Sequence, residues 1–260
     1  MLRILSWWPC VLFAACVGCG SNSTPASPTS PTAPVPPPSG PSVSFLLIDA
    51  STIGRGTQAA LVTGQSHQMR VRGVTPQGLS DIEAAWTSDN PAVLSSAPQG
   101  RITGVANGWA TIVAVYQGVS ATMNVRVATD YGGGWPGTLR LISCDSPDAA
   151  FCAQRFPPGT RRPLQLSVTM DRLFAVVRFN WDLDGSTLLL TETVEVGLDG
   201  SLAFAGAAHD SRGFEAPLII AGWRAALAAP DRLTGRVTLI HGLRDPARTE
   251  WELVDVTRVR

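Results

Sequence analysis

Hydrophobic and polar residues alternate with a period of two over much of the chain between residues 43 and 129. The pattern is clear in Met69–Arg72, Ala110–Tyr116 and Met123–Val127. Because successive side chains of a strand point to opposite faces, such alternation over a few residues predicts half-buried strands. Turn residues recur about every ten positions, which is typical of a β-sandwich. We therefore predict that residues 43–129 form a first folded domain of this kind.

The alternation resumes after Tyr131–Gly134, a glycine-rich segment that we interpret as a hinge. The candidate strands of residues 130–260 are about 135–143, 163–170, 173–181, 186–197, 200–208, 214–225, 232–241 and 249–259. Tight connections at 171–172, 182–185 and 198–200 predict a meander of antiparallel neighbours.

Eight such strands in about 130 residues favour an up-and-down β-barrel, because closure removes exposed sheet edges. A flattened sandwich is the alternative. No window has a convincing helical period, although Gly222–Ala229 is rich enough in alanine for one helical turn. The fold class expected for the chain is all-β, an immunoglobulin-like sandwich followed by an eight-stranded, lipocalin-like barrel.

The first residues have the features of an export signal. Arg3 precedes an apolar run from Ile4 to Ala15, and a basic start with a short apolar core is typical of a secretory signal peptide. The run is shorter than the roughly 20 residues that cross a membrane. It ends in Phe13-Ala14-Ala15-Cys16-Val17-Gly18-Cys19, which resembles the lipobox of bacterial lipoproteins.

Two cysteines compete for the lipid. Cleavage before Cys19 removes residues 1–18 and leaves Cys144 and Cys152 to pair with each other. Cleavage before Cys16 would leave Cys19 as a free thiol in an oxidising compartment. We predict lipidation of Cys19, with Cys16 as the alternative. No Asp follows Cys19, so analogy with lipoprotein sorting implies a cell-envelope protein whose lipid binds the outer membrane.

Residues 19–42 form a linker, with eight prolines among serine, threonine and small residues. This composition cannot bury a core, and the prolines favour extended polyproline II. At about 3.1 Å per residue, the linker extends up to roughly 70 Å from the membrane.

One family resemblance lies in the first domain. It is carried by Gly64-Gln65, Ala85–Val93, Gly100–Gly108 and Ala110–Ile112. Over about 45–128 the chain resembles the bacterial immunoglobulin-like domains of group 2. The resemblance implies a spacer or adhesion module with Trp86 buried between its sheets, and it implies no chemistry. Trp109 stands where a small or polar residue is more usual in that family, which leaves packing against a neighbouring domain or contact with a ligand as its alternatives.

A shorter resemblance marks the second domain. Gly133-Gly134-Trp135 is similar to the Gly-x-Trp start of lipocalins and related barrels. That resemblance implies that Trp135 closes the barrel base and that Arg258 or Arg260 covers its ring.

Cys144 and Cys152 enclose seven residues after the first strand of this domain. In an exported chain this spacing predicts a disulfide. Redox catalysis favours the shorter Cys-x-x-Cys spacing, and a metal site needs more ligands nearby.

Charge and motifs exclude several functions. The 20 basic residues, all arginine, balance 20 acidic ones, which gives no basic excess for nucleic acid. His209-Asp210-Ser211 are adjacent, whereas members of a catalytic triad come from distant segments. His241 has Asp245 nearby. We predict no enzyme, no cofactor and no metal, with a hydrolase using His209 or His241 as the alternative.

The second domain holds four tryptophans that either fill the barrel or line a pocket: Trp135, Trp181, Trp223 and Trp251. An eight-stranded barrel is either filled by side chains or holds one small ligand. The hypothesis is a non-enzymatic lipoprotein whose sandwich is a spacer for a β-domain that binds a small apolar ligand, a glycan or an envelope protein. A purely structural module is the other alternative.

Overall fold

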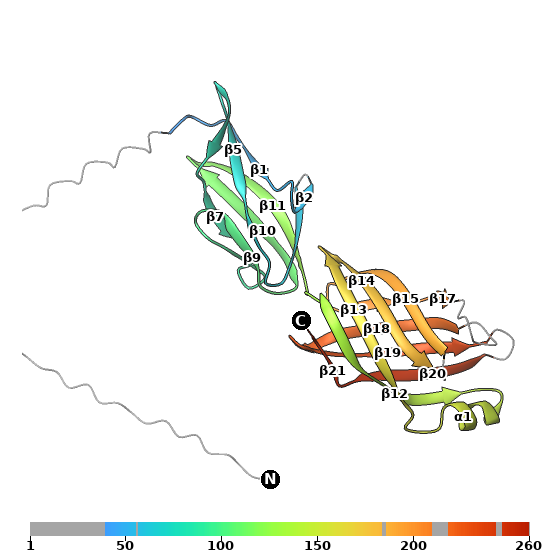
Figure 1. Ribbon diagram of the computed structural model, residues 1–260. Helices are drawn as coiled ribbons and strands as arrows, with labels where there is room; N and C mark the ends of the chain where they lie inside the picture. The colour runs from blue at the N-terminus through green and yellow to red at the C-terminus, as the bar shows by residue number, and fades with distance from the viewer. Residues whose placement is uncertain (1–39, 56, 184–185, 210–217, 243–245, 260) are drawn as a thin grey trace, which may run out of the picture. The chain divides into compact units, whose positions relative to one another are not determined.

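The computed structural model describes residues 40–259 apart from 56, 184–185, 210–217 and 243–245 (Figure 1). The predicted signal peptide, Cys16, Cys19 and nearly all of the predicted linker lie outside the described residues. Gly40–Arg260 form one compact unit. Within the described part, strands dominate and α1 (Ala149–Arg155) is the one α-helix, which confirms the all-β prediction. No helix among these residues has the length and apolar character needed to cross a membrane.

The first domain is a sandwich of short sheets. One sheet has the order β1-β5-β6, with bounds Phe45–Asp49, Arg70–Thr75 and Gly78–Ile82. A second has the order β2-β3-β11-β10-β7, with bounds Gly54–Arg55, Gln58–Val62, Val119–Ala128, Gly108–Tyr116 and Ala85–Ser88. A third has the order β4-β9-β8, with bounds Ser66–Gln68, Arg101–Gly104 and Leu94–Ser96. All of these pairings are antiparallel except that of β3 with β11.

The sandwich core follows the alternation in the sequence. In β10, Ala110, Ile112 and Ala114 are buried, whereas Trp109 and Val115 are exposed. Trp86 is 7% exposed and belongs to the same buried cluster, as the resemblance implied. Each large apolar side chain buried in this way contributes roughly 1.5–3 kcal/mol to folding.

The second domain is one rolled antiparallel sheet with the strand order β15-β14-β13-β12-β20-β19-β18-β16 (Figure 1). The bounds along this order are Ser186–Glu195, Phe174–Leu183, Arg161–Asp171, Gly133–Asp145, Ala247–Val254, Arg232–His241, Leu218–Ala229 and Leu202–Phe204. Two short strands extend it: β17 (Ala207–His209) pairs with β18, and β21 (Val256–Thr257) pairs with β19. The first long strand, β12, pairs with β20 near the chain end, so the predicted barrel is confirmed as a nearly closed sheet.

The barrel is interrupted between β15 and β16. A tight turn joins these strands, in which the Gly197 N–H donates to the Ser201 carbonyl at 2.8 Å. The two strands approach each other, yet no ladder pairs them among the described residues. We call this interruption the β15/β16 seam.

Three details differ from the expected strands. The strand predicted at 200–208 is two strands, β16 and β17, separated near Gly206, whose φ is +83°. The strand predicted at 249–259 divides into β20 and β21 at Asp255, whose φ is +53°. Gly222–Ala229 continues β18 and forms no helical turn, because every second residue there packs into the core or pairs along the ladder.

Helix α1 was not predicted. It begins within the loop that Cys144 and Cys152 enclose and continues past Cys152 to Arg155, and the Asp148 side chain caps it by accepting the Ala150 N–H at 2.9 Å. None of its residues is buried, so the helix has no apolar stripe from which hydrophobic periodicity could reveal it.

The segment interpreted as a hinge is held against the second domain. Tyr131 is fully buried, and its hydroxyl donates to the Gly200 carbonyl. Burial raises the pKa of Tyr131 to about 12. Arg126, only 2% exposed, donates from the sandwich to the Gly197 carbonyl at 3.0 Å, and Asn107 donates to the Leu198 carbonyl at 2.6 Å. The two domains are therefore joined by hydrogen bonds as well as by the chain.

Candidate functional site

The second domain brings all four candidate tryptophans into one hydrophobic core. Trp135, Trp181, Trp223 and Trp251 are each no more than 3% exposed. Their side chains point inward because they occupy the core-facing positions of β12, β14, β18 and β20. Burial alone fits both filling of the core and contact with a ligand, and the indole hydrogen bonds distinguish the four.

Two of these tryptophans have hydrogen-bond partners within the domain. The Trp135 Nε1–H donates to the Tyr131 carbonyl at 2.8 Å, and the Arg258 guanidinium lies 5.4 Å from the Trp135 ring centroid. The expected cover of Trp135 by a late arginine is thereby confirmed for Arg258. The Trp251 Nε1–H donates to Thr249 Oγ1 at 2.8 Å. Both indoles are therefore held by the fold itself.

The other two tryptophans, Trp181 and Trp223, differ in their hydrogen bonding. Neither Trp181 Nε1 nor Trp223 Nε1 has a hydrogen-bond partner among the described residues, and both atoms are buried. A buried donor without a partner costs about 1–3 kcal/mol, and buried polar groups in proteins are nearly always satisfied. The Phe179 ring lies against both indoles, with centroid distances of 6.0 Å to Trp181 and 5.1 Å to Trp223.

These rings form a cluster beside the seam. Phe204 of β16 lies 5.3 Å from Trp223 and 5.8 Å from Phe179, so the aromatic cluster consists of Phe179, Trp181, Phe204 and Trp223. Phe179 pairs in register with Leu190 of β15, which is also buried. The cluster thus lies on the core side of β15 and β16, the two strands that no backbone ladder joins among the described residues. The two tryptophans of the cluster were expected from the sequence as candidate ligand contacts, and its two phenylalanines were not.

His241 belongs to a structural network. The Trp251 N–H occupies Thr249 Oγ1 as an acceptor, and Oγ1 lies 2.9 Å from His241 Nε2. A hydroxyl donates one hydrogen and accepts up to two, so the imidazole tautomer decides which of Thr249 Oγ1 and His241 Nε2 is the donor. Burial, with a smaller contribution from Arg155, lowers the pKa of His241 to about 4. The Phe156 ring packs 5.0 Å from the imidazole.

The described residues contain no assembled catalytic site for the alternative function, a hydrolase using His209 or His241. Asp245 lies outside the described residues, as do Asp210 and Ser211. His209 ends β17 and pairs with Leu218 through its backbone, and its side chain is likewise outside the description. Within that part, no group of three or more His, Cys, Asp or Glu is arranged to hold a metal ion.

The predicted disulfide is present. Cys144 of β12 and Cys152 of α1 are bonded, with their Cα atoms 5.8 Å apart. The bond ties the helix to the end of the strand, next to Phe151 and Phe156.

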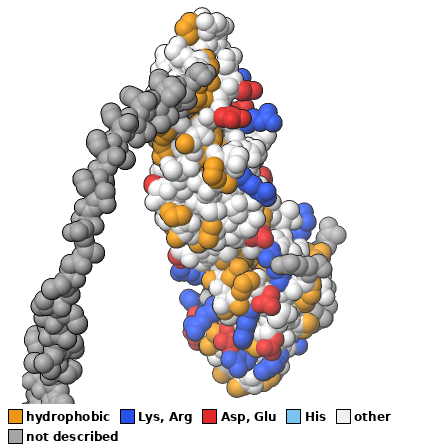
Figure 2. Space-filling view, turned by 90° about the vertical axis from the view of Figure 1, so that its left-hand side faces the viewer, with side chains coloured by type: hydrophobic (Ala, Val, Ile, Leu, Met, Phe, Trp, Pro, Cys, Tyr) orange, Lys and Arg blue, Asp and Glu red, His pale blue; other side chains and the backbone are white. Residues whose placement is uncertain are grey.

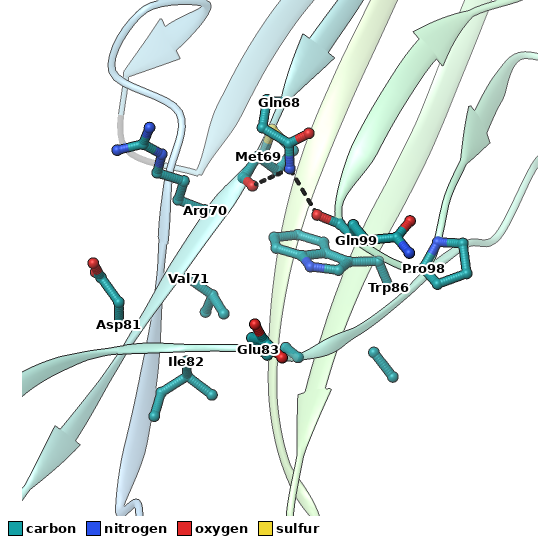
Figure 3. A pocket seen from close by; sticks show the side chains of 12 residues that line it. Gln68, Met69, Arg70, Val71, Asp81, Ile82, Glu83, Trp86, Pro98 and Gln99 are labelled. Atoms are coloured by element: carbon teal, nitrogen blue, oxygen red, sulfur yellow. Dashed lines mark hydrogen bonds between the residues drawn. The ribbon is translucent and has the colours of Figure 1, made fainter.

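A groove in the sandwich was not predicted. It has a volume of about 550 Å³ and is lined from β5, β6 and β7 and from the loop at 98–99. Figure 3 shows the Trp86 indole lying across it, with Arg70, Asp81 and Glu83 around it. Gln68 Nε2 closes one side by donating to the Gln99 carbonyl at 2.6 Å. Trp86 belongs to the core and the charged residues around the groove are exposed, so we assign no ligand to it.

The face of the molecule seen in Figure 2 shows no single dominant charge. On the face seen in Figure 2, hydrophobic side chains are scattered, and basic and acidic ones are interspersed on the second domain. Two exposed arginines there are paired with acids, Arg140 with Glu252 and Arg224 with Asp199.

Comparison with known proteins identifies no family. No protein-family model matches the chain, and no curated protein sequence matches it. Among solved structures, the chain is similar to the S-layer protein SbsC, domains 5-6, with 15% identity and a TM-score of 0.29 over 83% of this chain and 99% of that chain. A TM-score this low carries no argument about fold or function. The chain's own residues are therefore the basis for inferring what it does.

Proposed function

We propose that the protein is a non-enzymatic, lipid-anchored component of the cell envelope whose second domain binds a small apolar ligand that carries an acceptor oxygen. The observation behind this proposal is a pair of buried indole donors, Trp181 Nε1 and Trp223 Nε1, that have no hydrogen-bond partner among the described residues. The anchor is Cys19, the linker holds the domains away from the membrane, and the sandwich serves as a spacer, as its resemblance implies.

The aromatic cluster has the chemistry that such a ligand needs. Ligand pockets combine apolar and aromatic walls with a few polar groups that fix orientation. Phe179 and Phe204 supply apolar surface, and the two indoles supply donors but no acceptor. A hydroxyl, carbonyl or carboxylate oxygen would therefore complement the site. Trp135 and Trp251 leave the set of candidate ligand contacts, because their donors are already occupied.

The seam provides the route to the cluster. Elsewhere in the sheet, separating two neighbouring strands breaks a ladder of backbone hydrogen bonds. Between β15 and β16, no such ladder exists among the described residues. Parting these strands therefore costs mainly side-chain contacts, and it exposes Phe204, which is already only partly buried.

The test uses the non-lipidated chain and three matched ligands: decane, 1-decanol and decanoic acid. We expect 1-decanol or decanoic acid to raise the unfolding temperature, because a ligand that binds only the folded state stabilises it. The gain in the free energy of unfolding is about 2.7 kcal/mol at a hundredfold excess of ligand over Kd. Decane, which has no oxygen, should give a smaller rise. The proposal fails if decane stabilises the protein as much as the oxygenated ligands do, or if none of the three does.

Variants locate the site. Trp181→Phe and Trp223→Phe keep an aromatic ring but lose the N–H donor, and each should weaken ligand binding about tenfold. Trp251→Phe is the matched control, since it removes a core indole whose donor binds Thr249. It should lower stability and leave the affinity of the folded protein unchanged. Equal loss of affinity in all three variants would count against the aromatic cluster.

A further inference from the structure

An exposed tryptophan lies on the outside of the sandwich. Trp109 is 46% exposed near the start of β10, whereas Trp86 on β7 of the same sheet is buried. Exposing a large aromatic ring to water forgoes the stabilisation that its burial would give. The sequence left packing against the neighbouring domain as one alternative for Trp109, and nearly half of the side chain remains open to solvent.

Polar side chains surround this ring in a regular arrangement. Thr111 pairs in register with Asn124 of β11, and Asn124 pairs with Gln58 of β3. Because residues two apart share a face of a sheet, this row lies beside Trp109 on the outer face. Asp89 completes the surroundings, since its Oδ1 accepts the Thr111 N–H at 2.6 Å. A hollow of about 370 Å³ is lined by Trp109 and these four polar residues together with Ala110. We call it the Trp109 groove.

The hollow continues beyond the indole. A neighbouring one of about 350 Å³ shares Trp109 and Gln58 with the Trp109 groove and includes Phe174, a second exposed aromatic ring. The indole therefore has usable space on both sides. An elongated ligand would fit this arrangement better than a compact one.

The strand end that carries Trp109 is held in place by Arg126, its neighbour across the ladder. Trp109 pairs with Arg126 across the β10–β11 ladder, and Arg126 is 2% exposed. Its guanidinium donates to Asn107 Oδ1 at 3.0 Å and to the Gly108 carbonyl at 3.2 Å. The strand end that carries Trp109 is thus fixed before any ligand binds, which lowers the entropic cost of binding.

The lining residues distinguish between ligand classes. An apolar partner needs a continuous apolar surface, whereas Trp109 stands among amides, a hydroxyl and a carboxylate. An anionic polymer needs free cations, whereas the cation paired with Trp109, Arg126, is buried on backbone carbonyls. A sugar needs what the groove offers: a flat aromatic face for its C–H groups, and planar amide and carboxylate groups for its hydroxyls.

We infer that the Trp109 groove binds a glycan, namely a β-1,4-linked chain of pyranose rings with equatorial hydroxyls. The flat faces of such rings would stack on the Trp109 indole while Gln58, Asn124 and Asp89 bind the hydroxyls at the ring edges. This site is on the first domain and does not rest on the ligand proposed for the second. It would make the sandwich a binding module as well as a spacer.

The test measures binding of cellohexaose, chitohexaose and soluble peptidoglycan glycan strands to the non-lipidated chain by calorimetry and by NMR chemical-shift changes. Binding of at least one probe, with shifts centred on β10, β11 and β3, is expected. If chitohexaose and the peptidoglycan strands bind and cellohexaose does not, the groove prefers N-acetylated sugars. If no probe binds at millimolar concentration, the inference is wrong.

Variants complete the test. Trp109→Ala should weaken binding of the best probe at least tenfold, Trp109→Phe should weaken it less, and Asn124→Ala should also weaken it. Val115→Ala is the control, because Val115 lies on the same face of the same strand, is 39% exposed and does not line the groove. Since Trp109 is exposed, its variants should unfold at the wild-type temperature. Unchanged affinity in Trp109→Ala, or an equal loss in Val115→Ala, would overturn the inference.

Discussion

The Arg258 guanidinium covers the ring of Trp135 near the two ends of the second domain's chain, 5.4 Å from the ring centroid. The same guanidinium donates from Nε to the Gly132 carbonyl at 2.7 Å and pairs with Asp130 at 2.8 Å. One side chain from the last residues of the chain therefore fixes the segment that leads into β12. Because Arg258 is largely buried, these contacts are little screened by water.

Arg258→Met should lower the free energy of unfolding by about 2–3 kcal/mol, because it removes a desolvated cation–π contact and leaves the Gly132 carbonyl without its donor. Urea denaturation of the 40–260 unit measures the change. Arg232→Met is the matched control, since Arg232 is exposed on β19, and it should change stability by no more than about 0.5 kcal/mol. Equal effects of both substitutions would show that Arg258 has no special role.

Gly100→Ala should destabilise the sandwich more than Gly64→Ala. Both glycines have positive φ, +84° and +82°, so alanine costs about 1–2 kcal/mol at either position. At Gly100, the added Cβ would also lie 2.7 Å from Trp86 Nε1 and 3.1 Å from the Met69 carbonyl, whereas nothing lies within 4 Å at Gly64. The extra cost at Gly100 is about 1–3 kcal/mol. Thermal unfolding of the two variants compares them, and equal losses would exclude the predicted clash.

The strands of the second domain were predictable because each long strand has one face in the core. The pattern at 163–170, 173–181 and 232–241 gave β13, β14 and β19 within about two residues. The break near Gly206 was not predicted, because the residues from Leu202 to Ala208 are all apolar apart from that glycine and have no alternation that could change at the break. Only the positive φ at that glycine, which the sequence permits but does not require, ends the strand.

The candidate site was predictable only in part. Trp135 and Trp251 reach acceptors close in sequence, the Tyr131 carbonyl and Thr249 Oγ1. Trp181 and Trp223 differ from them only in what the folded sheet places around their indoles, so no local signal separates the two pairs. The Trp109 groove combines β3, β10, β11 and the residue after β7. In the sequence, only the unusual residue type at Trp109 indicated this groove. The other lining residues come together through the strand register, which the sequence did not predict.

The double substitution Cys144→Ala with Cys152→Ala should lower the free energy of unfolding by about 2.5 kcal/mol on the chain-entropy estimate for so short a loop. Amide hydrogen exchange in α1 should speed up most, because none of the helix residues is buried and the disulfide is its tie to β12. Reduction of the wild-type protein should reproduce both effects. Unchanged exchange in α1 after reduction would mean that the Asp148 cap and the phenylalanine contacts hold the helix.

Cys19→Ser should abolish incorporation of radiolabelled palmitate and release the protein from the membrane fraction. Cys16→Ser should leave both unchanged, because the signal peptide that contains Cys16 is removed in the predicted processing. Labelling of the expressed chain in a bacterial host, followed by fractionation, measures the two variants side by side. Loss of label in Cys16→Ser with retention in Cys19→Ser would assign the lipid to Cys16 and extend the linker by three residues.

Stability should depend on pH through His241. Burial, with a smaller contribution from the positive charge of Arg155, lowers the pKa of His241 from its ordinary 6.5 to about 4 in the folded protein. Between these values the unfolded chain binds a proton that the folded chain does not bind, and stability therefore rises with pH. The contribution is fully present above about pH 6.5 and is lost as the pH falls toward 4. It amounts to at most about 3 kcal/mol.

The variant His241→Gln isolates this contribution, because glutamine keeps an acceptor for the Thr249 hydroxyl but does not titrate. The free energy of unfolding, measured by urea denaturation from pH 4 to pH 7.5, should depend less steeply on pH in the variant than in the wild type. His67→Gln is the control: the pKa of His67 is lowered by a smaller burial, and the imidazole also contacts Thr52 at the surface. His67→Gln should therefore reduce the pH dependence of the free energy of unfolding less than His241→Gln does. If His241→Gln retained the full wild-type slope between pH 4 and 6.5, the Trp251–Thr249–His241 network would not hold the imidazole neutral.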